Sequence, residues 1–175
     1  MSAQKGHLEV AKTLLEAGGC ELVMLTADGG FSCLLVSAHN GHLEVVKALL
    51  EVGGRELLML TMDDGASCLY MSAQNGHLEV VKALLEAGGC ELVMLIADDG
   101  ASCLFMSVQK GHLEVMKALL EGGARRELLI LTTDIGASCL FVARHYPHGE
   151  VCRVLNMACQ NAGLFSCEIT ILKRG

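Results

Sequence analysis

The chain has 175 residues and a formal net charge of −7, and hydrophobic residues make up 52% of it while aromatic residues make up only 3%. This acidity argues against binding to nucleic acid or to anionic lipid, because both need Lys and Arg in excess. The scarcity of aromatic rings argues against a typical globular enzyme core and favours thin, closely packed helices built from Leu, Val, Ala and Met.

The nine cysteines indicate a reducing environment. Their number is odd, and the sequence shows neither a signal-peptide pattern nor an apolar run long enough to span a membrane. We therefore expect an intracellular, cytoplasmic protein in which cysteine serves as a small buried hydrophobic residue.

A repeat of 35 residues organises the chain. The string Gly-His-Leu-Glu-Val recurs at Gly6, Gly41, Gly76 and Gly111. A degraded copy follows at 147–151, and residues 41–75 and 76–110 are identical at 27 of 35 positions. Because one such unit cannot bury its own apolar face, the units must stack on one another. The sequence predicts one array over 1–175, made of a truncated first repeat (1–27), three repeats (28–62, 63–97 and 98–133) and a degenerate last repeat with a tail (134–175).

Each unit is expected to form two short helices and a loop. In the unit 63–97, Ser67 caps a first helix that extends to about Gln74. A second helix is expected over about Leu78–Ala87, where apolar residues recur at helical spacing, and Gly88 is expected to end it in a left-handed conformation.

An apolar arm follows the second helix, at 57–60, 92–96 and 128–131. Its composition fits a short turn packed against the adjacent copies, and an exposed patch for a partner is the alternative. The turn signal Asp98-Asp99-Gly100 then leads into the next Ser-Cys-Leu.

Two stretches of the unit resemble the ankyrin repeat. Residues 64–70 read Asp-Gly-Ala-Ser-Cys-Leu-Tyr where that family has Asp-Gly-x-Thr-Pro-Leu-His, and residues 76–85 match its second helix almost letter for letter. The resemblance extends from the first residues to about Leu155. It implies an all-α solenoid of stacked helix-turn-helix units joined by hairpin-like loops, and a non-catalytic, cofactor-free role in binding other proteins.

The chain departs from the family pattern at the start of the first helix. Ser-Cys replaces Thr-Pro in every copy, and the following His becomes Leu35, Tyr70, Phe105 or Phe141. We expect the serine to cap the helix, and the apolar side chain to replace polar contacts between repeats by packing. Residues 1–4 align with 71–74, midway through a first helix, so the array is expected to be a fragment or to start at an internal Met.

The residues that resemble catalytic or metal sites have structural explanations. A column of histidines lies at the turn before the second helix, and we expect each to bond a neighbouring loop. Stacked units hold such atoms on the order of 10 Å apart, too far for a shared zinc, and no Cys-x-x-Cys accompanies them. Outside the columns, Cys152, Cys159 and Cys167 cluster with His145 and His148, but without zinc-finger spacing. We expect no catalytic residue, metal, cofactor or small-molecule substrate.

By resemblance, the partner-binding residues lie at the turn tips and at the ends of the first helices. Because the tips are acidic, we expect a protein partner with a basic patch and salt-sensitive binding. The candidate positions are Asp28, Phe31, His39, Asn40, Asp63, Asp64, Gln74, Asn75, Asp98, Asp99, Gln109, Lys110, Asp134, Ile135, His145 and Tyr146.

Other classes of function give competing hypotheses. A 35-residue helical pair is also similar to the RNA-binding pentatricopeptide repeats, but that family lacks the Asp-Gly turn and RNA binding conflicts with the charge. Two hypotheses stay open: the recognition portion of a larger enzyme such as a kinase or ubiquitin ligase, and a truncated, non-functional repeat fragment. The near-identity of the middle units and the apolar residues near the end favour the fragment.

Overall fold

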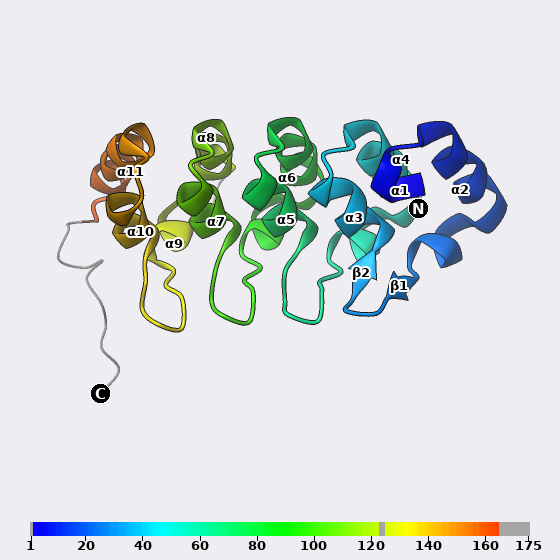
Figure 1. Ribbon diagram of the computed structural model, residues 1–175, viewed down its shortest axis with the longest axis horizontal. Coiled ribbons are helices and arrows are strands. Elements are labelled where there is room, and N and C mark those ends of the chain that lie inside the picture. The colour runs from blue at the N-terminus through cyan, green and yellow to red at the C-terminus, as the bar shows by residue number, and fades with distance from the viewer. Residues whose placement is uncertain (1, 123–124, 165–175) are drawn as a thin grey trace.

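The computed structural model describes residues 2–122 and 125–164. Two rows of helices run along the molecule, and the loops between units project from one edge (Figure 1). One row contains α2 (Leu8–Val23), α4 (Leu43–Leu58), α6 (Leu78–Val93), α8 (Leu113–Glu121) and α11 (Gly149–Asn161). The other contains α1 (Ser2–Lys5), α3 (Cys33–His39), α5 (Cys68–Asn75), α7 (Cys103–Lys110) and α10 (Cys139–His145), and a short helix, α9 (Arg125–Ile130), follows α8. Each helix packs on its counterpart in the next unit, which confirms the expected all-α solenoid.

A serine caps the start of every complete first helix. The hydroxyl oxygen of Ser67 accepts a hydrogen bond from the Tyr70 N–H at 3.1 Å, and Ser102 does the same for Phe105. Ser32 and Ser138 repeat the bond at 3.2 Å. The expected cap is confirmed in all four copies. The first helices therefore have a defined start although the family's proline is missing.

The second helices run further than expected. In α6 the backbone kinks at Gly89, with φ 55° and ψ −150°, and helix continues to Val93. The expectation that Gly88 ends the helix is therefore wrong. Gly88 is buried and its backbone is helical, whereas Gly89 adopts a conformation that is essentially reserved for glycine.

The apolar arm is part of the core. It forms the last two residues of α4 and of α6 and the second half of α9. It places Leu57, Leu92 and Leu128 in wholly buried positions. Ile96 and Ile130 point outward and are exposed. The expectation that the arm packs against adjacent copies is confirmed, although the first part of each arm is helical and only the rest leaves the helix.

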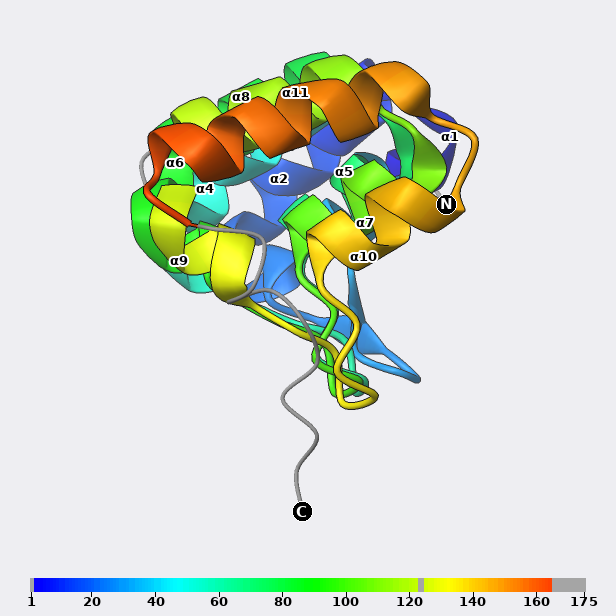
Figure 2. The same ribbon diagram turned by 90° about the vertical axis from the view of Figure 1, so that its left-hand side faces the viewer.

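The loops between units form a row of short hairpins. In the first, β1 (Thr26–Ala27) pairs antiparallel with β2 (Phe31–Ser32). The later loops keep one bridge each, such as Ile96 with Ser102. Viewed along the array, the hairpins superimpose and project away from the helices (Figure 2).

A column of cysteines replaces the family's proline. Cys68, Cys103 and Cys139 are buried, and the Cys68 and Cys103 thiols each lie 3.6 Å from a backbone carbonyl, of Leu58 and Val93 respectively. Burial raises the pKa of all three thiols from the usual 9.0 to about 12. They act as small core residues, as expected.

The position after Ser-Cys-Leu packs to different extents along the array. Leu35 and Phe105 are buried and Tyr70 is half-buried, so packing does replace the polar contact there. Phe141 is exposed and contacts the His145 ring, with ring centroids 4.1 Å apart and the two planes tilted by 32°. For Phe141 the expectation is wrong, because no described unit follows α10 to cover it.

Among the described helices, none combines the length and apolar character needed to cross a membrane.

Candidate protein-binding face

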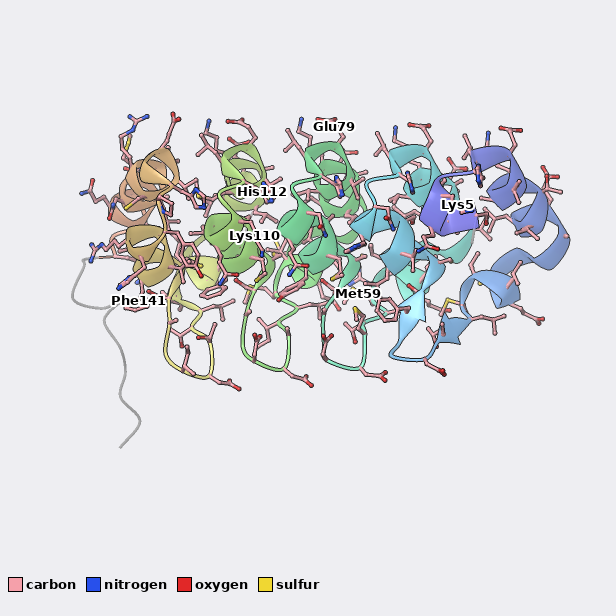
Figure 3. All side chains as sticks on the ribbon, viewed as in Figure 1. Lys5, Met59, Glu79, Lys110, His112 and Phe141 are labelled. Carbon is pink, nitrogen blue, oxygen red and sulfur yellow. The ribbon has the colours of Figure 1, made fainter. Side chains whose placement is uncertain are left out.

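Three histidines of the column, His42, His77 and His112, bond their unit to the one before it. The Nε2 of His77 donates to the His39 carbonyl at 2.9 Å, and the Nε2 of His112 donates to the Gln74 carbonyl at 3.0 Å. His42 donates to Gln4 in the same way. The expected structural role is confirmed, and the acceptor lies at the end of the preceding first helix. In Figure 3, His112 lies where its unit meets the preceding one.

A glycine makes room for each histidine ring. A Cβ at Gly41 would lie 2.6 Å from the ring Nδ1 of His77, and a Cβ at Gly76 would lie 2.7 Å from the ring of His112. The Gly-His pair is therefore an interlocking contact between units: the glycine of one unit receives the histidine of the next. This contact fixes the spacing of the first helices, whose ends carry candidate binding residues.

The turn tips are joined by backbone hydrogen bonds. The Asp98 N–H donates to the Asp64 carbonyl at 2.8 Å, and the Asp134 N–H donates to the Asp99 carbonyl at 2.9 Å. Gly100 has φ 78° and lies so close to the next tip that a Cβ would meet the Thr132 carbonyl oxygen at 3.0 Å. The tips therefore form a continuous ridge and not a set of separate loops.

The ridge carries six exposed carboxylates, at Asp28, Asp63, Asp64, Asp98, Asp99 and Asp134. Two of them also shape the turn, since Asp64 Oδ1 accepts from the Ala66 N–H and Asp99 Oδ1 from the Ala101 N–H. The negative field reaches Tyr70, whose pKa is raised by burial first and then by the charges of Asp99 and Asp64. The ridge is therefore an acidic edge with fixed geometry.

Side chains at the ends of the first helices also meet across units. Asn75 Nδ2 donates to His39 Nδ1 at 3.1 Å, and Gln109 Nε2 donates to the Tyr146 hydroxyl at 3.4 Å. Lys110 is exposed and lies on the side of α7 that faces the viewer in Figure 3. These residues supply polar groups along the ends of the first helices, apart from the acidic ridge at the turn tips.

A hollow of about 490 Å³ lies between these two features, beside α3. Its wall includes three predicted residues, Phe31, His39 and Asn40, and four that were not predicted: Gln4, Leu35, Val36 and Met71. Val36 and Met71 occupy the same position in successive units, so the periodicity could have identified them.

The predicted positions form two rows and not one compact cluster. Fourteen are exposed, among them Ile135 at 89%, and only Gln74 and Gln109 are half-buried. The structure brings Asn75 to His39 and Gln109 to Tyr146, while Lys110 and Ile135 contact no other predicted side chain through a hydrogen bond or ion pair within the described chain.

Metal-ligating side chains do not converge within residues 2–122 and 125–164 in groups of three or more. Cys152 and Cys159 lie on α11, and Cys167 lies outside the described residues. His145 uses its Nδ1 on the Phe141 carbonyl at 2.8 Å.

Two family models match the chain. A model of ankyrin repeats in three copies matches residues 1–94, and a model of the single ankyrin repeat matches residues 99–129. A search of curated proteins returned no match.

Proposed function

Because the chain belongs to the ankyrin repeat family, whose members are generally protein–protein interaction modules, we propose that it binds a protein partner through the acidic ridge and the ends of the first helices. It acts as a non-catalytic adaptor or scaffold in an intracellular, cytoplasmic setting. The single observation that carries this proposal is the row of six exposed tip carboxylates held in register by backbone hydrogen bonds.

The chemistry of the ridge supports a partner with a basic surface. None of the six fixed carboxylates forms a salt bridge among the described residues, and such a row attracts a surface rich in Lys and Arg. This attraction weakens as salt screens it. The neighbouring hollow at Phe31 and Met71 offers an apolar contact beside this charge. A basic protein surface carrying an exposed apolar side chain therefore fits the face best.

The test compares two charge-matched variants in a pull-down with the complete protein. One variant changes all six tip aspartates to asparagine, which keeps the oxygen acceptors of the Asx turns at Asp64 and Asp99. The control changes six exposed glutamates away from the ridge to glutamine, at Glu16, Glu51, Glu56, Glu86, Glu121 and Glu127.

We expect the tip variant to lose the partner and the control to retain it, although both change the net charge equally. Affinity for the captured partner should fall by at least about ten-fold between low and physiological salt. Capture by the tip variant, or affinity that is indifferent to salt, would contradict the proposal.

The fragment hypothesis is favoured by a specific observation, the near-identity of the middle units, which present almost the same tip residues. A thermal melt separates the two hypotheses. A cooperative transition supports a folded binding module, and its absence supports a non-functional fragment.

A further inference from the structure

The first hairpin of the row differs from the later ones at two positions. The tips of the next two units both read Asp-Asp-Gly-Ala, at 63–66 and 98–101, and the last tip reads Asp-Ile-Gly-Ala at 134–137. The first tip reads Asp-Gly-Gly-Phe, at 28–31, in the β1–β2 hairpin of Figure 1. It has glycine where two units carry a second aspartate, and phenylalanine where all three carry alanine.

The two changes are linked by packing. The ring of Phe31 lies beside Gly29, since a Cβ added at Gly29 would stand 3.1 Å from Phe31 Cε2. Antiparallel pairing with Ala27 fixes the backbone of Phe31. Phe31 is 40% exposed, whereas the alanines at its position are at most 8% exposed, at Ala66, Ala101 and Ala137. At this position of the hairpin, only the first of these units offers a partner an apolar side chain.

Phe31 forms one wall of the hollow of about 490 Å³ beside α3. Leu35, Val36 and Met71 extend this apolar wall, and none of the seven lining residues is Asp, Glu, Lys or Arg. The volume falls within the range of about 300–1,000 Å³ that is usual for pockets that enclose a bound group. The hollow therefore favours an uncharged, apolar side chain.

Two carboxylates lie at the tips beside Phe31. Asp28 belongs to the same hairpin, and the Asp63 N–H donates to the Gly29 carbonyl at 3.1 Å. Both aspartates are exposed, and neither forms a salt bridge among the described residues. A basic partner is attracted to these tips and not to the uncharged hollow. Charge and apolar surface are thus separated, side by side.

The middle tips cannot fix where a partner sits along the ridge. Residues 63–66 and 98–101 are identical, so a purely basic segment gains nearly the same contacts after a shift by one unit. At protein interfaces, an anchor seated in a pocket carries more of the binding energy than the contacts around it. Phe31 and its hollow supply a pocket of this kind. Ile135, at the last tip, is 89% exposed and stands clear of neighbouring side chains.

We propose that the hollow beside Phe31 is the anchor site for the partner and fixes its register on the ridge. Its occupant is one large apolar side chain of a basic segment, whose flanking Lys or Arg residues contact Asp28 and Asp63. Gly29 keeps the site open, because a side chain there would displace the Phe31 ring. The inference rests on the proposed function, and it adds the place and the chemistry of the segment that binds.

The test uses two synthetic peptides and the complete chain. One peptide has a single leucine with two arginines on each side, and the other has alanine in place of the leucine. Fluorescence anisotropy at low salt measures the affinity of the chain for each labelled peptide. We expect the leucine peptide to bind at least about ten-fold more tightly, because its side chain fills the hollow.

Phe31→Ala should reduce this ratio of affinities to about one. The variant has at 31 the residue that the later units already have there, so it should melt within about 3 °C of the unaltered chain. Phe141→Ala is the matched control, because Phe141 is 41% exposed and lies on α10, away from the hollow. This control and Ile135→Ala should both keep the preference for leucine.

Two charge-matched variants locate the segment along the ridge. Asp28→Asn with Asp63→Asn should weaken binding of the leucine peptide by at least about ten-fold, because it removes the carboxylates beside the anchor. Asp98→Asn with Asp134→Asn removes the same charge from the far tips and should weaken binding by less than about three-fold.

Several results would overturn the proposal while leaving the proposed function intact. One is equal affinity for the two peptides, with salt-sensitive binding that is lost when all six tip aspartates are changed to asparagine. Another is a preference for leucine that survives Phe31→Ala or that Phe141→Ala abolishes as well. Equal losses for the two charge-matched variants would refute the register. If neither peptide bound the unaltered chain, the proposed function and this inference would fall together.

Discussion

At the scale of single residues, the histidine column shows that one polar contact between units can be lost while another is kept. The family's His-to-Thr contact is lost, since Leu35, Tyr70 and Phe105 hold that position. The histidine before the second helix retains a direct hydrogen bond to the preceding unit, at 2.9 Å for His77. Polar contact between units therefore survives at a different residue.

Replacing His77 with alanine should destabilise the protein by about 1–2 kcal/mol, since it removes one bond between units and leaves the His39 carbonyl without that donor. Urea unfolding measures the change. His7 holds the same position in the first unit, is exposed and has no such bond in the described chain, so His7→Ala is the control and should cost less than about 0.5 kcal/mol. Equal losses for the two variants would contradict this role.

The buried thiols predict loss of stability at high pH. Burial raises the pKa of Cys68, Cys103 and Cys139 from 9.0 to about 12. Above pH 9 the unfolded chain loses these protons while the folded chain keeps them, so the stabilising effect is complete below pH 9 and is lost as pH rises toward 12. Each thiol should remove about 1.4 kcal/mol of unfolding free energy per pH unit in this window.

Urea titrations at pH 8, 9 and 10 measure this slope. Replacing the exposed Cys20 and Cys90 with alanine should leave it unchanged, because neither thiol is buried. Replacing Cys103 with alanine should remove one of three equal contributions, and so about one third of the slope that the three buried thiols produce together. A slope that is the same in both variants would exclude the buried column as its source.

At the scale of elements, Gly89 joins two helical segments of α6 that run in different directions. Its φ of 55° with ψ of −150° is strained for any residue with a Cβ. A Cβ added at Gly89 would meet no neighbouring atom within 4 Å, so the strain is in the backbone and not in a clash. Gly89→Ala should therefore cost about 1–3 kcal/mol through the backbone alone.

Gly149 gives a matched control for Gly89. A Cβ at Gly149 also meets nothing within 4 Å, but its φ is not positive. Gly149→Ala at the start of α11 should be neutral or stabilise the protein by up to about 1 kcal/mol, because alanine restricts the unfolded chain. If Gly89→Ala were equally neutral in thermal or urea unfolding, the kink would not be a constraint.

The elements could be predicted from the sequence wherever the repeat itself carried the signal. The serine caps, the Asp-Gly turns and the stacking of units all follow from residues that recur every 35 positions. The helical start of the arm was missed because two successive glycines stand before it, and composition cannot tell which of the two adopts positive φ. For the candidate face, the exposed tips followed from the turn signals, and the periodicity pairs Val36 with Met71. That these two residues line a hollow depends on how successive first helices are spaced in three dimensions.

At the scale of the whole molecule, the main contacts between described elements lie within one unit or between adjacent units, so stability is a sum of unit and interface contributions along one dimension. Residues that are equivalent in the repeat should then contribute different amounts to stability, depending on where their unit lies in the array. Leu14 and Leu84 are equivalent in the repeat, yet Leu14 is 46% exposed and Leu84 is wholly buried between α4 and α8 neighbours.

Leu84→Ala should accordingly cost about 2–5 kcal/mol, because it leaves a cavity in a covered interface, while Leu14→Ala should cost less than about 1 kcal/mol. Urea unfolding of both variants at low protein concentration measures the difference directly. Hydrogen exchange adds a spatial readout, since Leu84→Ala should open the middle of the array and leave α10 and α11 less affected. Equal costs would mean that α2 is as well covered as α6, and the open end of the solenoid would then have a partner in solution.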